Sequence, residues 1–178
     1  MMLNNGGICV TLPGGLWLDG VCHQEAELRS LVGSDEAFLV EEGESLFPVQ
    51  QTTALLARCL THLGSLTPVT PDTVRSLTVG DREALLLHLR RLTLGDRLQC
   101  VLSCPEPDCG EKMDLELRVS ELLLPPYPHA RERYETAVAE DGTAYRVRFR
   151  LPTGADQEAA ARLAHSDPQA AAELLLRR

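Results

Sequence analysis

The sequence predicts an α+β fold with a helical core, two β-hairpins and a C-terminal pair of helices. Leucines recur at the spacing of one helix face within residues 49–63 and 81–94. Apolar and polar residues then alternate, as they do in strands, through residues 98–119 and 134–150. The chain ends in two alanine-rich stretches that each begin with a helix-capping residue, and these predict the C-terminal pair.

The N-terminal segment Cys9–Leu28 is predicted to be extended, with turns at Pro13-Gly14-Gly15 and at Asp19-Gly20. The acidic pair Asp35-Glu36 then suits the first turn of a helix, where the helix dipole favours negative charge. This pair begins the helical core. The next helix opens at Pro48, and its leucine spacing predicts that it extends to Leu63.

The clearest helix is Asp81–Leu94. One face of it is formed by four leucines, Leu85, Leu86, Leu89 and Leu92. Arg82, Arg90 and Arg91 lie elsewhere on this helix. Just before this helix, Thr70 is expected to cap a short helical turn that begins with Pro71.

Both predicted hairpins lie in the second half of the chain. Residues 97–120 form a cysteine-rich hairpin insertion with one apolar face, and residues 125–133 form a proline-rich linker. The second hairpin turns at Asp141-Gly142, a pair that tolerates the positive φ of a tight turn. We expect residues 1–178 to form a single domain, because this length suits one hydrophobic core.

The C-terminal helices begin at Thr153, with Asp156 completing a capping box, and at Asp167-Pro168. The second of them contains Leu174 and Leu175 in an apolar run that lacks a capping residue. Such a run indicates either a docked terminus or contact with a partner helix. Both leucines are therefore candidate partner-binding residues.

A short internal repeat connects two of these elements. Arg29–Glu36 resembles Arg150–Gln157, because each has an arginine at a strand end, a turn with glycine and an acidic helix start. Two related strand-turn-helix units would explain the likeness. Equally, many strand-to-helix turns carry these capping signals, and the sequence leaves both explanations open.

Composition excludes several function classes. The 178 residues include 17 basic and 26 acidic side chains, which gives a net charge of −9. Nucleic acids and acidic membrane surfaces attract basic faces, so we expect neither as a partner. No apolar run reaches the roughly 18 residues of a membrane span. Residues 1–7 lack the basic and apolar regions of a signal peptide, so we expect a cytoplasmic protein.

The first hairpin carries a candidate metal site at its tip. Cys104 and Cys109 stand in a Cys-Pro-x-x-x-Cys-Gly pattern, which resembles a zinc knuckle although its gap of four residues is wide. Cys100 would be a third ligand. A closed structural zinc site needs four, so the last would be Cys9, Cys22, Cys59 or one of the five histidines. The alternative is that these cysteines are buried thiols on the apolar face of the hairpin.

Arginines form a second candidate site. Arg146, Arg148 and Arg150 alternate along one strand, so they face the same side and could dock an acidic partner through paired hydrogen bonds. The alternative is a solvated face whose charge is balanced by Glu132, Glu135 and Glu140.

Catalysis finds little support in the sequence. It contains neither a nucleophile-elbow serine nor a phosphate-binding glycine loop. A thiol or zinc hydrolase would need an open metal position with a base nearby, and neither is recognisable. We therefore expect a protein that is not an enzyme and has no small-molecule substrate.

Four motifs in a fixed order resemble a known family. They are Leu77–Leu87 with its Gly-Asp-Arg-Glu start, Leu94–Arg97, the cysteine hairpin and Phe149–Asp156. Over roughly residues 12–163 the chain resembles the T-even bacteriophage baseplate proteins, often called baseplate hub assembly chaperones. Members also occur in gene clusters for phage-tail-like contractile injection systems. The resemblance implies a small cytoplasmic assembly chaperone whose partners are baseplate hub or spike proteins. The alternative is a structural baseplate subunit retained in the mature particle.

Overall fold

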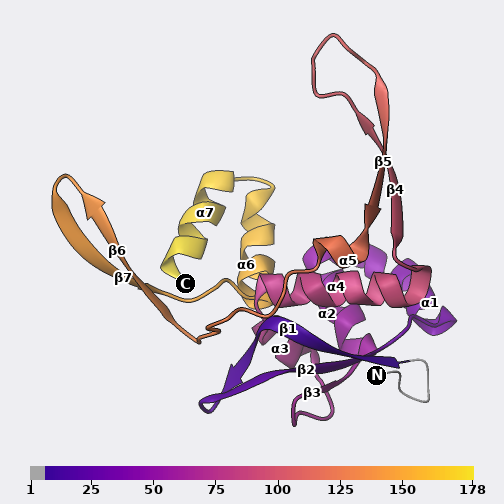
Figure 1. Ribbon diagram of the computed structural model, residues 1–178, viewed down its shortest axis with the longest axis horizontal. Coiled ribbons are helices and arrows are strands. Elements are labelled where there is room, and N and C mark those ends of the chain that lie inside the picture. Colours follow the sequence, from indigo (N-terminus) through magenta and orange to yellow (C-terminus); the bar gives the residue numbers. More distant parts are fainter. Residues whose placement is uncertain (1–6) are drawn as a thin grey trace.

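The structure is a computed structural model that describes residues 7–178. The expectation of no signal peptide was based on residues 1–7, and all but the last of these lie outside the described residues. The N-terminal part contains β1 (Gly7–Leu18), β2 (Val21–Arg29), α1 (Gly33–Glu41), the 3-10 turn η1 (Gly43–Ser45), α2 (Pro48–Cys59) and β3 (Leu60–Leu63). The middle contains α3 (Pro71–Ser76), α4 (Val79–Leu94), β4 (Arg97–Ser103), β5 (Lys112–Arg118) and α5 (Val119–Leu122). The chain continues with β6 (Tyr134–Glu140), β7 (Thr143–Phe149), α6 (Gly154–Ala164) and α7 (Pro168–Arg177) (Figure 1).

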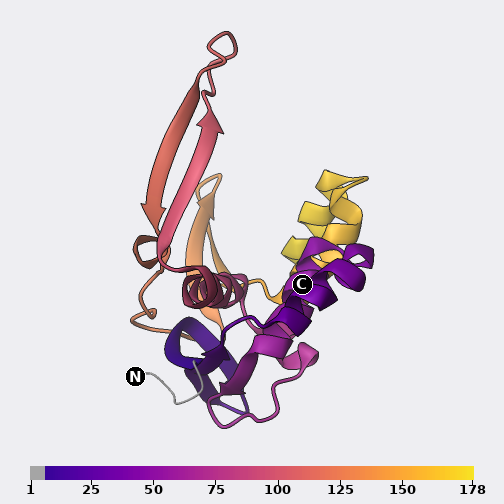
Figure 2. The ribbon, with the colours of Figure 1, turned by 90° about the vertical axis from the view of Figure 1, so that its right-hand side faces the viewer.

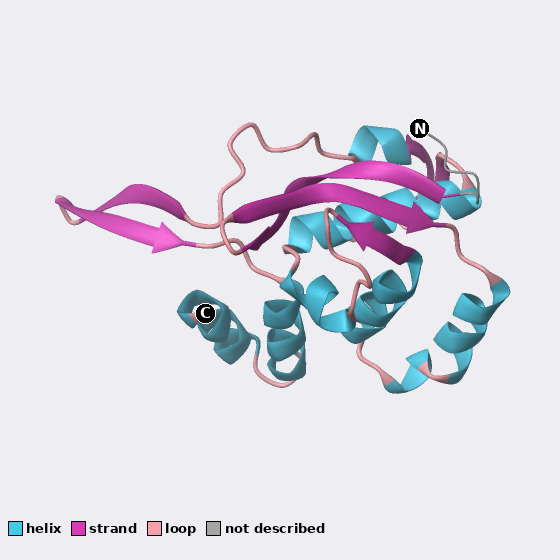
Figure 3. Ribbon diagram, turned by 90° about the horizontal axis from the view of Figure 1, so that it is seen from below, coloured by secondary structure: helices cyan, strands magenta, loops and turns pink. Residues whose placement is uncertain are grey.

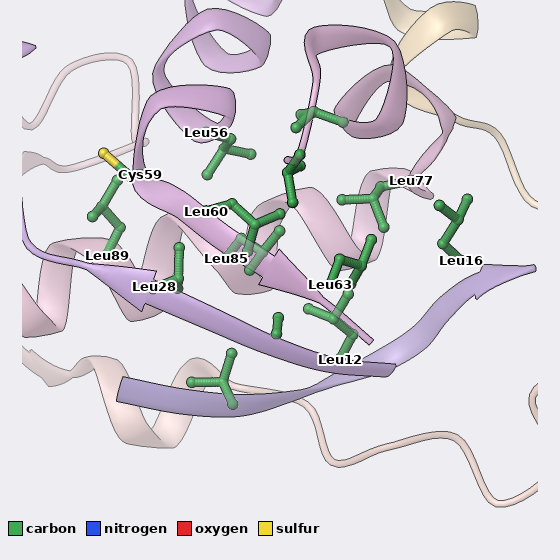
Figure 4. Close-up of a cluster of buried hydrophobic side chains, with 14 residues drawn as sticks. Leu12, Leu16, Leu28, Leu56, Cys59, Leu60, Leu63, Leu77, Leu85 and Leu89 are labelled. Carbon is green, nitrogen blue, oxygen red and sulfur yellow. The ribbon is translucent and has the colours of Figure 1, made fainter. Parts of the chain in front are cut away.

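The predicted α+β class is confirmed, together with the two hairpins and the C-terminal helical pair. The helices of the core pack on an antiparallel sheet of order β1-β2-β3, in which β2 is central. Leucines from the strands and from α2 and α4 fill the space between these layers (Figure 4). Among them, Leu12, Leu56 and Leu85 have no exposed surface. Burial of an apolar side chain of this size stabilises the fold by about 1.5–3 kcal/mol.

The predicted turn at Pro13-Gly14-Gly15 is wrong, because β1 continues through these residues to Leu18. The pairing of β1 with β2 slips between Thr11 and Leu16, which marks a bulge. The backbone N–H groups of Gly14 and Gly15 donate instead to Oδ1 of Asp81, at 2.7 and 3.1 Å. A carboxylate on a distant helix therefore replaces the ladder partners that the bulge lacks.

The predicted helix over residues 49–63 ends earlier, at Cys59. Leu60–Leu63 form β3, which pairs antiparallel with β2 so that Leu60 lies opposite Leu28. Leucine spacing alone fits either structure over four residues. Residues 60–63 form a strand because pairing with the open edge of β2 buries Leu60 and Leu63.

Arg82 lies off the leucine face of α4 and is nevertheless buried. Its side chain is 1% exposed. The guanidinium donates to Oγ1 of Thr53 at 2.9 Å and to the carbonyls of Val49 at 2.9 Å and Val74 at 3.3 Å. Burial lowers its pKa from the ordinary value. These bonds tie the start of α4 to α2 and α3.

Two of the motifs that are far apart in the sequence meet beside Arg82. The N–H of Val79 donates to the carbonyl of Pro152 at 2.9 Å, and the N–H of Gly154 donates to the carbonyl of Leu77 at 3.0 Å. Gly154 lies directly against the Arg82 guanidinium, where a Cβ atom would overlap with it. The start of α6 is thereby fixed to the start of α4.

Two hairpins extend from this body in different directions (Figures 1 and 2). The β4–β5 hairpin extends beyond α4 and α5. The β6–β7 hairpin extends on the side of α7, and the C-terminus lies near its base (Figure 3). Its turn at Asp141-Gly142 has φ of +49° and +77°, as the sequence predicts.

The packing of Gly154 against Arg82 generates a stability prediction. We expect Gly154→Ala to lower the free energy of unfolding by about 1–3 kcal/mol, because the added methyl overpacks a buried site. The control is Gly33→Ala at the equivalent first position of α1, where a Cβ meets nothing within 4 Å. Urea denaturation of both variants measures the difference, and equal midpoints would contradict the packing argument.

Candidate partner-binding surface

The β4–β5 hairpin exposes an apolar face. Cross-strand neighbours on that face are Leu98 with Leu117, Cys100 with Leu115 and Leu102 with Met113. Towards the tip, Leu102, Met113 and Leu115 are 47%, 46% and 38% exposed. An isolated two-stranded hairpin has no second layer of its own, so its apolar face can be buried only against another surface. This face is therefore a candidate binding surface.

The predicted zinc ligands lie on the same hairpin. Its strands end where the N–H of Cys104 donates to the carbonyl of Glu111 at 2.8 Å, and Cys109 follows in the tip loop. Cys100 lies opposite Leu115, half-exposed rather than in a core. Within residues 7–178, no three His, Cys, Asp or Glu side chains gather closely enough to hold a metal ion. The residues placed here do not form a four-ligand site, and zinc stays a prediction.

On the β6–β7 hairpin, Arg146 and Arg148 share one acidic partner. Each Nε lies 3.1 Å from a different carboxylate oxygen of Glu135. All three side chains are largely solvated, as the balanced-face alternative assumes. One carboxylate against two guanidinium groups nevertheless leaves an excess positive charge on this face.

Arg150 has a different environment from the other two arginines. It follows the end of β7, and its guanidinium donates to both carboxylate oxygens of Asp156, at 2.6 and 2.9 Å. Arg178 donates to the same carboxylate at 2.8 Å. The hydrogen bond from Arg150, together with those from the backbone and side chain of Thr153, holds the pKa of Asp156 well below its usual range. Arg150 thus fastens the C-terminal helices to the strand.

A pocket of about 650 Å³ lies between β7 and the end of α7. It is lined by Arg148, Arg150 and Leu175 from the predicted set, and by Val147, Phe149 and Leu176, which sequence reasoning missed. Arg146 and Leu174 lie outside its lining. The alternation of arginines with Val147 and Phe149 on one strand was the signal for the missed residues, since it predicts that they share the opposite face.

No helix within the described part of the chain is both long enough and apolar enough to cross a membrane.

Comparisons with known proteins identify one family. The profile of the family described as "T4 bacteriophage base plate protein" matches residues 31–177. Neither the curated proteins nor the solved structures gave a match. The matched region includes the Asp81-Arg82 pair, the cysteine hairpin and the Asp156 cluster.

The ion pairs of Asp156 predict a pH dependence. Its pKa is lowered in the folded protein, so its contribution to stability is complete above about pH 5 and is lost as the pH falls towards the folded pKa. We expect Asp156→Asn to lower the free energy of unfolding at pH 7 on the order of 2 kcal/mol. This deficit should shrink at pH 3.

Urea denaturation at pH 7 and pH 3 measures the effect. Asp141→Asn is the matched control, because it removes one carboxylate from an exposed turn where asparagine tolerates the same backbone. A deficit for Asp156→Asn that is equal at both pH values would contradict the ion-pair explanation.

Proposed function

Because the chain belongs to the T4 bacteriophage base plate protein family, we propose that it is an assembly chaperone for the baseplate hub of a contractile phage tail or a phage-tail-like injection system. Its partners are then hub or spike proteins. In this role it covers surfaces of an unassembled subunit until the subunit reaches its place in the baseplate.

The exposed apolar face of the β4–β5 hairpin carries this proposal. A face that includes Leu102, Met113 and Leu115 is suited to cover apolar surface or a strand edge of another protein. The hairpin extends from the body and is held at its base, where Asp96 accepts hydrogen bonds from the N–H and hydroxyl of Ser120 at 3.0 and 2.8 Å. It can therefore reach into a partner without rearrangement of the core.

In this role the protein is cytoplasmic, is not an enzyme and binds no nucleic acid, membrane or small-molecule substrate. The net charge of −9 supports the part on nucleic acids and acidic membranes, since both repel an acidic protein. The proposal therefore assigns the protein's effect on assembly to contact with other proteins alone.

A structural subunit retained in the mature particle is the second candidate. The exposed apolar side chains of β4–β5 favour it, because permanent interfaces are more apolar than transient ones. Both β4–β5 and the pocket beside β7 would then remain covered in the finished baseplate.

Mass spectrometry of purified particles distinguishes the two candidates. For a chaperone, we expect the protein to co-purify with a hub or spike subunit when the two are co-expressed, and to be absent from mature particles. A stoichiometric amount in mature particles would identify a structural subunit instead. Normal hub assembly after deletion of the gene would contradict both roles in assembly.

The hairpin face generates a further prediction. We expect Leu102→Ser combined with Leu115→Ser to weaken capture of the co-expressed hub or spike protein at least tenfold, because these side chains would form the contact. Val101→Ser on the opposite face is the matched control. Thermal unfolding should change little in either variant, since all three side chains are exposed. Equal capture by the two variants would exclude this face as the binding surface.

A further inference from the structure

The same ion-pair geometry occurs at two strand-to-helix junctions. At the end of β2, Arg29 donates to the two carboxylate oxygens of Asp35 at 2.6 and 3.1 Å. After β7, Arg150 makes the same pair with Asp156 at 2.6 and 2.9 Å. In both junctions the arginine also donates to the carbonyl of the next residue, at 3.0 and 3.1 Å. This detailed match favours two related units over a shared capping pattern.

A second arginine, at the end of the second helix of each unit, also binds the aspartate of the junction. Arg58 of α2 donates to Asp35 at 2.9 Å, and Arg178 after α7 donates to Asp156 at 2.8 Å. The first arginine of each junction donates to the backbone carbonyl of the second, at 2.8 Å for Arg58 and 3.2 Å for Arg178. The β1–β2 and β6–β7 connections also match, because each is an Asp-Gly turn in which both residues have positive φ. The unit β1–β2–α1–α2 thus corresponds to β6–β7–α6–α7.

The two units differ at one edge of the sheet. In the first unit, β3 follows α2 and pairs with β2, which becomes the central strand. Within residues 7–178, no strand pairs with the corresponding edge of β7. The outer edge of β6 corresponds to that of β1, and in the described part of the chain no further strand pairs with either edge. Among the strands that the structure describes in these two units, β7 therefore lacks a neighbouring strand that its counterpart β2 has.

Side chains at equivalent positions show the effect of the missing strand. Ala26 and Leu28 of β2 are 0% and 1% exposed, whereas their counterparts Val147 and Phe149 are 40% and 43% exposed. Leu176, the counterpart of the fully buried Leu56, is 88% exposed. These apolar side chains line the pocket between β7 and the end of α7. In the first unit, β3 lies at the corresponding place, between β2 and the end of α2.

We propose that the outer edge of β7 is a docking site for one extended segment of a partner protein, which adds antiparallel to β7 and seals the pocket with apolar side chains. Added strands bind through main-chain hydrogen bonds, and pockets for alternate side chains give specificity. That the partner belongs to the baseplate rests on the proposed function. The docking edge itself follows from the two units.

The first unit provides the template for the chemistry of this segment. Leu60 and Leu63 lie opposite Leu28 and Ala26, so the docking segment carries apolar residues opposite Phe149 and Val147. On the other face, His62 contacts Glu27 at 2.9 Å. Arg148 of β7 occupies the position that Glu27 has in β2, so a positive side chain stands where the first unit has a negative one. The segment therefore carries an acidic residue opposite Arg148.

Charge also disfavours a second copy of β7 as the occupant. Two antiparallel β7 strands centred on Val147 would place Arg146 of one copy opposite Arg148 of the other. Like charges directly opposite each other destabilise a strand pair. One Glu135 per hairpin already serves two arginines and leaves positive charge unbalanced.

A grafted strand tests whether the edge accepts such a segment. The probe is the full chain with a tail after Arg178 that repeats its own residues 59–66, with serine in place of the cysteine and aspartate in place of the histidine. The matched control tail has serine at every leucine position. We expect amide hydrogen exchange in β7, and not in β6, to slow at least tenfold with the leucine tail only. Equal exchange in β7 with both tails would overturn the proposal.

Two further measurements address the occupant. A tail with lysine in place of the aspartate should protect β7 less, because it faces Arg148. For the wild-type chain, we expect light scattering to show a monomer and the amide hydrogens of β7 to exchange rapidly at the same protein concentration. A dimer with protected β7 amides would identify a second copy as the occupant and would overturn the choice of partner.

Capture of co-expressed baseplate proteins then separates this inference from the proposed function. We expect the leucine tail to abolish capture and the serine tail to preserve it. Equal capture by both would overturn the docking edge and leave the baseplate role intact. If wild-type chain captures no baseplate protein, the baseplate role fails, and the inference of a baseplate strand at β7 fails with it.

Discussion

The burial of Arg82 is the constraint on which the rest of this structure depends. A guanidinium removed from water costs several kcal/mol unless its hydrogen bonds are replaced. Thr53, Val49 and Val74 accept hydrogen bonds from its two terminal nitrogens, so α2 and α3 have to stay in place around the start of α4. Glu158 of α6 completes the arrangement, since it accepts hydrogen bonds from Thr53 at 2.5 Å and from Arg75 at 3.0 Å. The close approach of Gly154 then attaches the second half of the chain.

This arrangement explains how a small core can support long exposed elements. The carboxylate of Asp81, next to Arg82, holds the bulge of β1, and the ion pairs of Asp35 and Asp156 hold each helix pair against its strand. The hairpins themselves contribute little buried surface. Their apolar residues are therefore available to partners, which fits a family whose members belong to baseplates.

Local sequence signals predicted the elements that are governed by local contacts. The hairpin turn at Asp141-Gly142 and the helix start at Pro48 follow from backbone preferences of a few residues. The bulge at Gly14 and Gly15 could not be predicted, because its partner Asp81 lies on a distant helix. The strand Leu60–Leu63 was missed for the same reason, since only the edge of β2 makes it extended. In the candidate site, the sequence predicted three arginines and two leucines as partner-binding residues, but not the pocket that brings Arg148, Arg150 and Leu175 together.

By itself, the sequence determined the α+β class, the two hairpins and the C-terminal helical pair, the acidic net charge and the resemblance of two arginine–aspartate junctions. Each of these depends on spacing or composition within a short stretch of chain. Only the tertiary structure decided that Arg82 is buried, that the cysteines lie on an exposed hairpin and that β7 has an open edge where β2 has β3. Burial and strand pairing are properties of surfaces that come together from distant parts of the chain, and no local pattern encodes which surface remains uncovered.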